Sequence, residues 1–317
     1  MQNIIEIKNL HLGFEIDDKY YEAIHGVNFN LEKGKMHAIV GESGCGKTAT
    51  VMSIIKLLPK NAKITEGKIL FEDKNLLSLK EKDLRKIRGR KIALIPQDPM
   101  TSLNPLYTIE SQMLETITLH NNVDKKEAYN IALKALDEVE IVNPKMRMKA
   151  YPHELSGGMK QRVIIAMALS SNADVIIADE PTTALDVTIQ AQILKLLSDI
   201  KRMGKSIILI THNLGIVKQY ADFVSIMYMG KIVEEAETNT LFRSPKHPYT
   251  KDLLAALPAT KGKKLENIKG SPSPITKPVQ GCPYHPRCKY SCQICACKTF
   301  DLILQKDGSK IACRLYE

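Results

Sequence analysis

Four short apolar runs, almost free of polar residues, are the most regular feature of the chain. They have the length of strands, and continuous apolar runs are typical of strands that are buried on both faces of a sheet. The runs occupy residues 36–40, 91–96, 175–180 and 206–211. Helices are expected between them, at residues 49–58, 159–170 and 187–203. This alternation of buried strands and helices predicts an α/β fold.

The flanking segments predict smaller units around this core. Residues 4–40 alternate between apolar and polar positions and turn at Asp17-Asp18, which predicts a small antiparallel β-meander. More strand and then a charged helix over about residues 77–87 are expected next. In residues 108–150 apolar side chains recur every four positions, which predicts an inserted helical subdomain at about residues 101–160. Residues 223–235 are expected to form a hairpin that closes the sheet.

The chain changes character after about Thr238, where prolines become frequent among lysines. We expect a linker and a small appended module there, so that the sequence divides into residues 1–236 and 237–317. Six of the seven cysteines lie in this part, between Cys282 and Cys313. In a cytosolic protein such a cluster favours a metal over disulfides.

The composition is that of a soluble globular protein, with 44% hydrophobic and 25% charged residues. No apolar run approaches the length that spans a bilayer, and the first residues lack the basic start and apolar core of a secretory signal. We therefore expect a cytosolic protein. The formal net charge of +10 is compatible with phosphate ligands, anionic lipid headgroups or nucleic acid as partners.

The segment after the first buried strand reads Gly41-Glu42-Ser43-Gly44-Cys45-Gly46-Lys47-Thr48. This is the G-x-x-x-x-G-K-T pattern of a phosphate-binding loop, with the preceding strand and following helix that the motif requires. Glycines let successive backbone N–H groups converge on one anion, and the start of the helix adds partial positive charge. Lys47 is expected to reach the β- and γ-phosphates, and the Thr48 hydroxyl to bind Mg²⁺.

Polar side chains stand at the ends of the other three buried runs. They are Gln97, the pair Asp179 and Glu180, and His212. An acidic strand end beside a phosphate loop holds Mg²⁺, usually through water, which suits Asp179. Glu180 is one residue further along, where it is expected to accept a proton from attacking water. As the third polar group at a strand end, His212 is interpreted as a γ-phosphate contact.

A second glycine-rich turn opens the helix over residues 159–170. Ser156 is a candidate N-cap, and Gly157 and Gly158 leave the backbone N–H groups of the helix start uncovered. Because this turn has no lysine equivalent to Lys47, we expect it to act on a phosphate that is held elsewhere.

The order and separations of these motifs resemble those of the ATP-binding subunit of an ABC transporter, over about residues 1–236. The motifs are the phosphate loop, Gln97, residues 155–162, the Asp179-Glu180 strand end, Ala184-Leu185-Asp186 and His212. The resemblance implies a P-loop, RecA-like ABC ATPase core of the α/β class with an antiparallel β subdomain and an inserted helical subdomain. It also implies ATP and Mg²⁺ as ligands.

The same resemblance implies a role for each motif. Gln97 would contact Mg²⁺ or water and relay to a membrane partner, Asp179 would bind Mg²⁺, Glu180 would be the catalytic base and His212 the switch histidine. The signature loop, Ser156, Gly157 and Gly158, would close on the ATP of a second subunit, and Asp186 would cross the dimer. Tyr21, or its neighbour Tyr20, would stack on the base. The phosphate-binding residues would be Gly41, Ser43, Gly44, Cys45, Gly46, Lys47, Thr48 and Thr50.

The end of the chain is similar to the C-terminal extension of oligopeptide and dipeptide importer ATPases. The similarity rests on His247-Pro248-Tyr249-Thr250 and on the spacing C-x5-C-x6-C-x17-C. It implies a small metal-binding extension with a [4Fe–4S] cluster, a group that suits all-thiolate ligation. The implied ligands are Cys282, Cys288, Cys295 and Cys313, with Cys292 or Cys297 as the alternative third ligand and Zn²⁺ as the alternative metal.

The resulting hypothesis is an ATPase that energises the uptake of oligopeptides or dipeptides from the cytoplasmic face of the cell membrane. Its partners would be a second ATPase subunit, two transmembrane permease subunits and, indirectly, an extracellular substrate-binding protein, with no nucleic acid. A nickel or metal-chelate importer stays open, because other subunits choose the substrate. Two further classes are a soluble ABC ATPase acting on nucleic acid or ribosomes, which usually has two cassettes in one chain, and a cluster-assembly ATPase.

Overall fold

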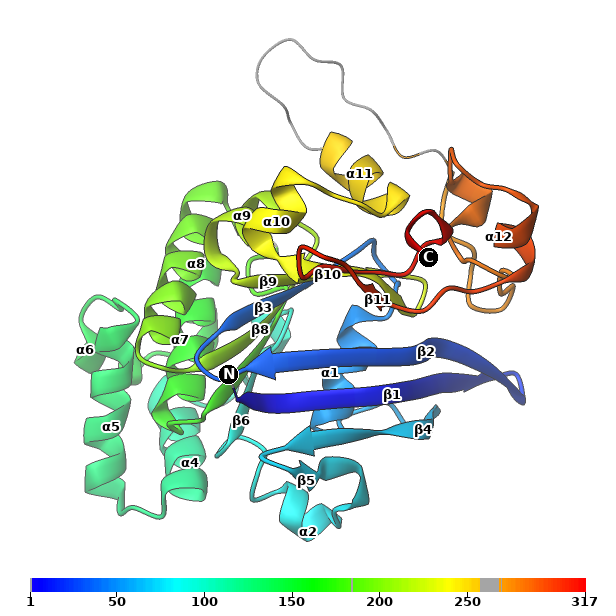
Figure 1. Cartoon of the computed structure of the whole chain (residues 1–317). Helices are drawn as coiled ribbons and strands as arrows, with labels where there is room; N and C mark the ends of the chain where they lie inside the picture. The colour runs from blue at the N-terminus through cyan, green and yellow to red at the C-terminus, as the bar shows by residue number, and fades with distance from the viewer. Residues whose placement is uncertain (1, 184, 257–267, 269) are drawn as a thin grey trace. The chain divides into compact units, whose positions relative to one another are not determined.

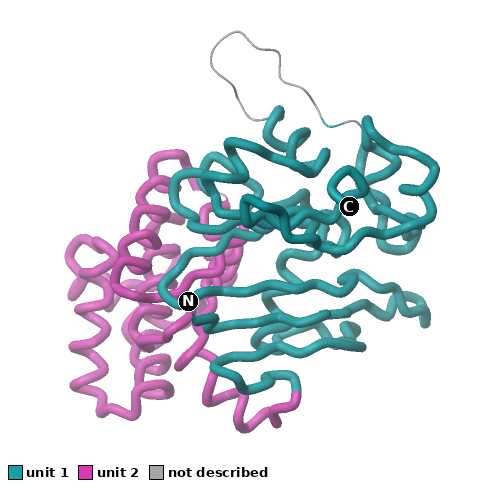
Figure 2. The backbone as a smooth tube through the Cα atoms, in the orientation of Figure 1, with its two compact units in different colours: residues 1–77, 211–317 teal, residues 78–210 magenta. Residues whose placement is uncertain are grey.

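A computed structural model of the chain describes residues 2–183, 185–256, 268 and 270–317. The chain forms two compact units, shown in different colours in Figure 2. Unit 1 comprises residues 1–77 and 211–317, and unit 2 comprises residues 78–210. Ala184, the first residue of the Ala184-Leu185-Asp186 motif, lies outside the described residues.

An antiparallel sheet of four strands begins unit 1 (Figure 1). Its strands, in the order β2-β1-β4-β5, are β1 (Asn3–Ile16), β2 (Lys19–Glu32), β4 (Ala62–Phe71) and β5 (Lys74–Asn75). Asp17 and Asp18 turn β1 into β2 with φ values of 48° and 57°. Two successive left-handed residues match the twist of the paired strands, and Asp tolerates this conformation. The predicted meander is confirmed.

A second group of strands in unit 1 surrounds the strand that precedes the phosphate loop. β3 (Met36–Val40) is fully buried and runs parallel to β9 (Phe223–Tyr228). β9 pairs with β10 (Lys231–Glu237) as the predicted hairpin. The end of the chain then extends this sheet, because β12 (Lys310–Ile311) pairs with β10 and β11 (Ile303–Leu304) pairs with β12.

The helices of unit 1 are short. The α-helices are α1 (Lys47–Ile54), α9 (Leu214–Tyr220), α10 (Thr238–Arg243), α11 (Pro248–Ala255) and α12 (Gln293–Cys297). The 3-10 turns are η3 (His285–Arg287) and η4 (Arg314–Tyr316), and η1 (Leu76–Ser78) ends this part of the chain. The predicted boundary between residues 236 and 237 falls at the end of β10, and the segment after it belongs to unit 1. The division of the sequence there stays a prediction.

Unit 2 has a buried parallel sheet and a group of helices. The strands, β6 (Ile92–Ile95), β7 (Val175–Asp179) and β8 (Ser206–Thr211), pair in that order. The α-helices are α2 (Glu81–Leu84), α3 (Pro99–Ser102), α4 (Ile109–Asn121), α5 (Lys125–Glu138), α6 (Pro144–Met148), α7 (Gly157–Ser170) and α8 (Val187–Arg202), and η2 covers Pro152–Glu154. The positions that recur by four, such as Met113 and Ala132, are buried, as the helical pattern predicts.

The charged helix predicted over residues 77–87 is shorter than expected. Within that range only α2 is an α-helix, because three-residue and four-residue bonds alternate after it: Lys86 N donates to Asp83 O at 3.1 Å, whereas Arg88 N donates to Leu84 O at 2.9 Å.

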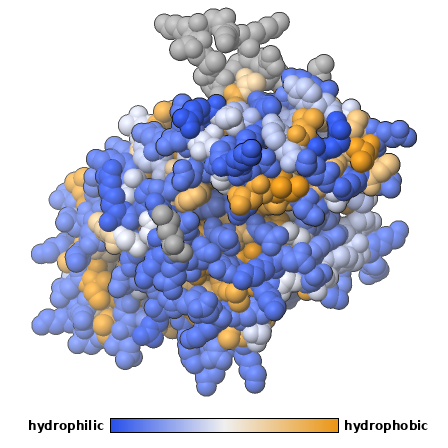
Figure 3. All heavy atoms as spheres, in the orientation of Figure 1, coloured by the Kyte–Doolittle hydropathy of each residue, from blue (hydrophilic) through white to orange (hydrophobic). Residues whose placement is uncertain are grey.

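The face shown in Figure 3 is mainly hydrophilic, with small scattered apolar groups. Among the described residues, the helices all fall short of the length and apolar character needed to cross a bilayer.

A buried histidine begins α11. His247 is 1% exposed, and its Nδ1 accepts the N–H of Tyr249 at 3.1 Å, which caps the helix. Nδ1 must therefore carry no proton, and the imidazole is neutral. Burial lowers the pKa of His247 from 6.5 to about 3, with a smaller contribution from the charge of Lys251.

This lowered pKa predicts a loss of stability in acid. The unfolded chain binds the proton more readily, so the contribution of His247 is fully present above about pH 6.5 and is lost at roughly 1.4 kcal/mol per pH unit as the pH falls toward 3. His247→Asn keeps a capping side chain that does not titrate. Urea unfolding between about pH 6.5 and about pH 4.5 should show a smaller loss of unfolding free energy in this variant. The exposed His153→Asn is the control, and an unchanged slope in His247→Asn would contradict the assignment.

Candidate functional site

The side chain of Lys47 folds back across the loop that links β3 to α1. Its Nζ donates to the carbonyls of Gly41 at 2.9 Å and Glu42 at 3.0 Å, and the residue is only 5% exposed. Gly44 and Gly46 have φ values of 76° and 105°, which side chains rarely adopt. The ammonium of the predicted loop is therefore held on two backbone carbonyls.

The residues predicted to bind phosphate fall into two groups. Ser43, Gly44 and Thr48 are exposed on the loop, whereas Cys45 and Thr50 are buried. Both the hydroxyl and the amide of Thr50 donate to Gly46 O, each at 2.9 Å. Thr50 therefore supports the first turn of α1, a role that sequence spacing could not separate from phosphate contact.

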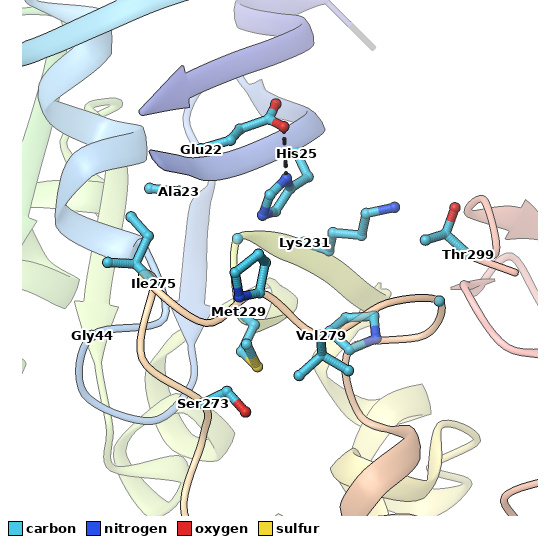
Figure 4. Close-up of a pocket in the computed structure, with 14 residues that line it drawn as sticks. Glu22, Ala23, His25, Gly44, Met229, Lys231, Ser273, Ile275, Val279 and Thr299 are labelled. Atoms are coloured by element: carbon cyan, nitrogen blue, oxygen red, sulfur yellow. Dashed lines mark ion pairs between the residues drawn. The ribbon is translucent and has the colours of Figure 1, made fainter. Parts of the chain in front are cut away.

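A cavity of about 140 Å³ lies beside the exposed side of the loop (Figure 4). Gly44 lines it together with Ala23 and Lys231, and the C-terminal segment contributes Ile275 and Val279. The extension is thus close to the phosphate loop.

The base-stacking candidates lie near the turn between β1 and β2. Tyr20 is 42% exposed, and a Cβ on Gly13 would lie 2.5 Å from its ring carbon Cζ, so this ring covers Gly13. Tyr21 is directly opposite Phe14 in the strand register, and both are half-buried. The sequence did not single out Phe14, because only the register brings it next to Tyr21.

In unit 2, two of the predicted strand-end residues meet. Gln97 Nε2 donates to Glu180 Oε2 at 3.2 Å, and Thr183 Oγ1 donates to the same oxygen at 3.0 Å. Glu180 follows Asp179, which is 2% exposed, and has a φ of 44°. A left-handed φ is uncommon in residues other than glycine. Thr183 was not among the predicted site residues. The one feature of the sequence that points to it is its place just after the acidic strand end.

The second glycine-rich turn has the predicted helix cap. Ser156 Oγ accepts the N–H of Met159 at 3.3 Å at the start of α7. Asp186 caps α8 in the same way, with Oδ1 accepting Ile189 N at 2.9 Å. Both capping residues are exposed. The start of α7 packs on the first turn of α8, because a Cβ on Gly158 would lie 2.8 Å from Ile189 Cγ2.

His212 is exposed between β8 and α9 in unit 1. Asn213, the next residue, accepts the N–H groups of Gly215 at 2.9 Å and Ile216 at 3.3 Å and so caps α9. The amide of Asn213 donates to Thr211 Oγ1 at 3.1 Å. The backbone that carries His212 is therefore fixed on its C-terminal side.

Four of the cysteines in the C-terminal segment line one small cavity: Cys282, Cys288, Cys295 and Cys313. Cys297 is exposed, and Cys292 lies outside this lining, with its Sγ 3.5 Å from that of Cys295. Burial raises the pKa of Cys282 to about 11, so the thiol is neutral unless a cation joins it. Within the described residues, no three His, Cys, Asp or Glu side chains form a group that could hold a metal ion as they stand.

Comparison with known proteins identifies the family. Residues 24–183 match the family described as "ABC transporter". The chain belongs to the ABC transporter family. Like other members, it is an ATPase coupled to transport, with the α/β ABC ATPase fold and its antiparallel sheet. Residues 233–295 also match the family described as "Oligopeptide/dipeptide transporter, C-terminal region".

Similar ABC transporter proteins cover nearly the whole chain. The dipeptide transport ATP-binding protein DppD of Bacillus subtilis is 46% identical over 100% of this chain and 96% of its own length. The oligopeptide transport ATP-binding protein OppD of Escherichia coli is 42% identical over 92% of this chain and 88% of its own. The dimeric ATP-binding cassette MJ0796 bound to ADP and Pi has a TM-score of 0.66 at 28% identity, over 74% of this chain and 98% of that one.

The packing of Gly158 generates a prediction that separates it from its neighbour. Gly158→Ala should lower the unfolding free energy by about 1–3 kcal/mol, because the added methyl must displace Ile189. Gly157→Ala is the matched control, since its Cβ would meet only Leu185 Cδ2 at 3.7 Å, an ordinary contact. Urea unfolding measures both, and equal stability of the two variants would refute the packing argument.

Proposed function

We propose that this chain is the ATP-hydrolysing subunit of an importer that takes up oligopeptides or dipeptides. The observation that carries the proposal is the similarity of both parts of the chain to peptide transporters, the ATPase part and the C-terminal segment at residues 233–295. Because ATPase cores of one family serve many substrates, the C-terminal match matters most for the substrate class. It favours peptides over nickel.

Phosphate binding in this proposal begins at Lys47. Its ammonium exchanges the carbonyls of Gly41 and Glu42 for the β- and γ-phosphates, while backbone amides of the loop and the start of α1 hold the remaining charge. Thr48, Gln97 and Asp179 are oxygen-bearing side chains at the loop and at strand ends, which suits Mg²⁺. The ion would neutralise phosphate charge during transfer.

Glu180 is proposed to orient and deprotonate the attacking water. Gln97 and Thr183 both donate to Glu180 Oε2, and these bonds fix the direction of the carboxylate. A base held in place loses little entropy when the reaction begins. His212 is proposed to contact the γ-phosphate, which its exposed imidazole permits.

The site is proposed to be complete only between two ATPase subunits. Ser156, Gly157 and Gly158 present the N-terminus of α7, and Ser156 is exposed, so this turn is available to the ATP of a second subunit. Closure of the pair would move two permease subunits at the cytoplasmic face of the membrane, with an extracellular binding protein delivering the peptide.

Reconstitution with the permease and binding proteins tests this function. Dipeptides or oligopeptides should stimulate ATP hydrolysis and be taken up, whereas nickel should do neither. Glu180→Gln should still bind ATP but lose turnover by about 10²–10⁴-fold, because the general base is gone. Glu237→Gln, an exposed carboxylate on unit 1, is the control. Nickel-dependent stimulation would overturn the substrate class, and normal turnover in Glu180→Gln would remove that residue as the base.

We also propose that Cys282, Cys288, Cys295 and Cys313 hold a [4Fe–4S] cluster, with Zn²⁺ as the alternative. The supporting observation is that these four side chains line one cavity, while Cys292 and Cys297 do not. Four thiolates suit either group, and its binding would cross-link the segments that carry the four cysteines.

Anaerobic purification tests the metal proposal. The protein should be brown with visible thiolate-to-iron absorption, and Cys295→Ser should lose colour, because it removes a ligand. The exposed Cys297→Ser should keep the absorption of the wild type. A colourless protein with stoichiometric zinc would refute the iron–sulfur cluster, and loss of the metal in Cys297→Ser but not in Cys295→Ser would refute the ligand set.

A further inference from the structure

The C-terminal segment bonds directly to the phosphate loop at one residue, Glu42. The backbone N–H of Glu42 donates to Tyr249 OH at 3.0 Å. The guanidinium of Arg287 donates two hydrogen bonds to the Glu42 carboxylate, with Nη1 2.7 Å from Oε2 and Nη2 3.0 Å from Oε1. The Glu42 carbonyl meanwhile accepts Lys47 Nζ. All three polar groups of this loop residue are therefore engaged, two of them by the extension.

Tyr249 is held rigidly where it meets the loop. It is fully buried, with its ring centroid 4.6 Å from that of Tyr228 and 5.2 Å from that of Tyr284. The motif His247-Pro248-Tyr249-Thr250 holds Tyr249 in place at the start of α11. His247 caps this helix, and the backbone N–H of His247 donates to the buried carboxylate of Glu234 at 2.9 Å. A hydroxyl on such a support acts as a fixed acceptor rather than a mobile one.

Arg287 is equally restrained. Its side chain is 6% exposed, against 26% for Glu42, and its guanidinium carbon lies 5.7 Å from the centre of the Tyr228 ring and 5.9 Å from that of Tyr284. It also donates to Tyr228 OH at 3.2 Å and to Gly270 O at 3.1 Å. A bidentate, partly desolvated Arg–carboxylate pair is directional and much stronger than an exposed ion pair.

We propose that Tyr249 and Arg287 are positioning residues of the ATP site, which hold the start of the phosphate loop in its binding conformation. Glu42 directly follows Gly41. Hydrogen bonds that hold Glu42 therefore also hold the carbonyl that accepts Lys47 Nζ, and they set the direction of the backbone amides that follow. Without these bonds the loop must be ordered when ATP binds, and that ordering weakens affinity. The extension is thus part of the nucleotide site and has a role there besides carrying the cysteines.

Two single variants test the proposal on the full-length chain. Tyr249→Phe removes the hydroxyl and keeps the ring contacts. Arg287→Met removes the guanidinium and keeps an apolar side chain of similar length. Each should raise the Kd for a fluorescent ATP analogue by about tenfold, because Glu42 loses the hydrogen bonds that hold it, and raise KM for ATP with kcat little changed. Tyr290→Phe and Arg243→Met, both exposed, should bind as the wild type does.

A double-mutant cycle excludes a merely structural effect. Because Arg287 acts through Glu42, adding Glu42→Gln to Arg287→Met should weaken binding no further. Wild-type affinity in Tyr249→Phe and Arg287→Met, or additive losses in the cycle, would overturn the proposal. If Arg287→Met fails to fold, Tyr249→Phe decides alone. Because these measurements need only ATP binding and hydrolysis, their outcome is independent of peptide transport.

Discussion

The structure around the phosphate loop depends on the hydrogen bonds made by the ammonium of one lysine and by a few backbone amides. Lys47 is almost fully buried, so its charge must be compensated, and the carbonyls of Gly41 and Glu42 do this. The loop also passes through Gly44 and Gly46 in the left-handed region, a conformation that other residues rarely adopt. Glycine-rich turns of this kind let successive backbone N–H groups converge on an anion.

The strand ends that carry the proposed catalytic residues follow a different constraint, the register of a buried parallel sheet. β6 and β7 pair in unit 2, so the residues beyond their carboxyl ends emerge at one edge. Gln97 and Glu180 therefore meet, although 83 positions separate them in the sequence. Glu180 itself has a left-handed φ, which is uncommon for a residue other than glycine.

The C-terminal segment contributes more than a place for cysteines. It adds a strand to β10, lines the cavity beside Gly44 and places Tyr249 and Arg287 on Glu42. Full-length similarity to peptide transport proteins includes this segment. The C-terminal segment therefore both matches the peptide-transporter family and contacts the phosphate loop.

The sequence by itself determined the phosphate loop, the buried strands and the helix cap at Ser156. It also determined the family, because all of these depend on local periodicity and on residues at fixed spacing. The ends of helices were less certain, as the short α2 shows. Only the tertiary structure decided which distant groups share a hydrogen bond. The pairing of Thr183 with Glu180, of Phe14 with Tyr21 and of Arg287 with Glu42 arises from register and packing, which no local pattern encodes.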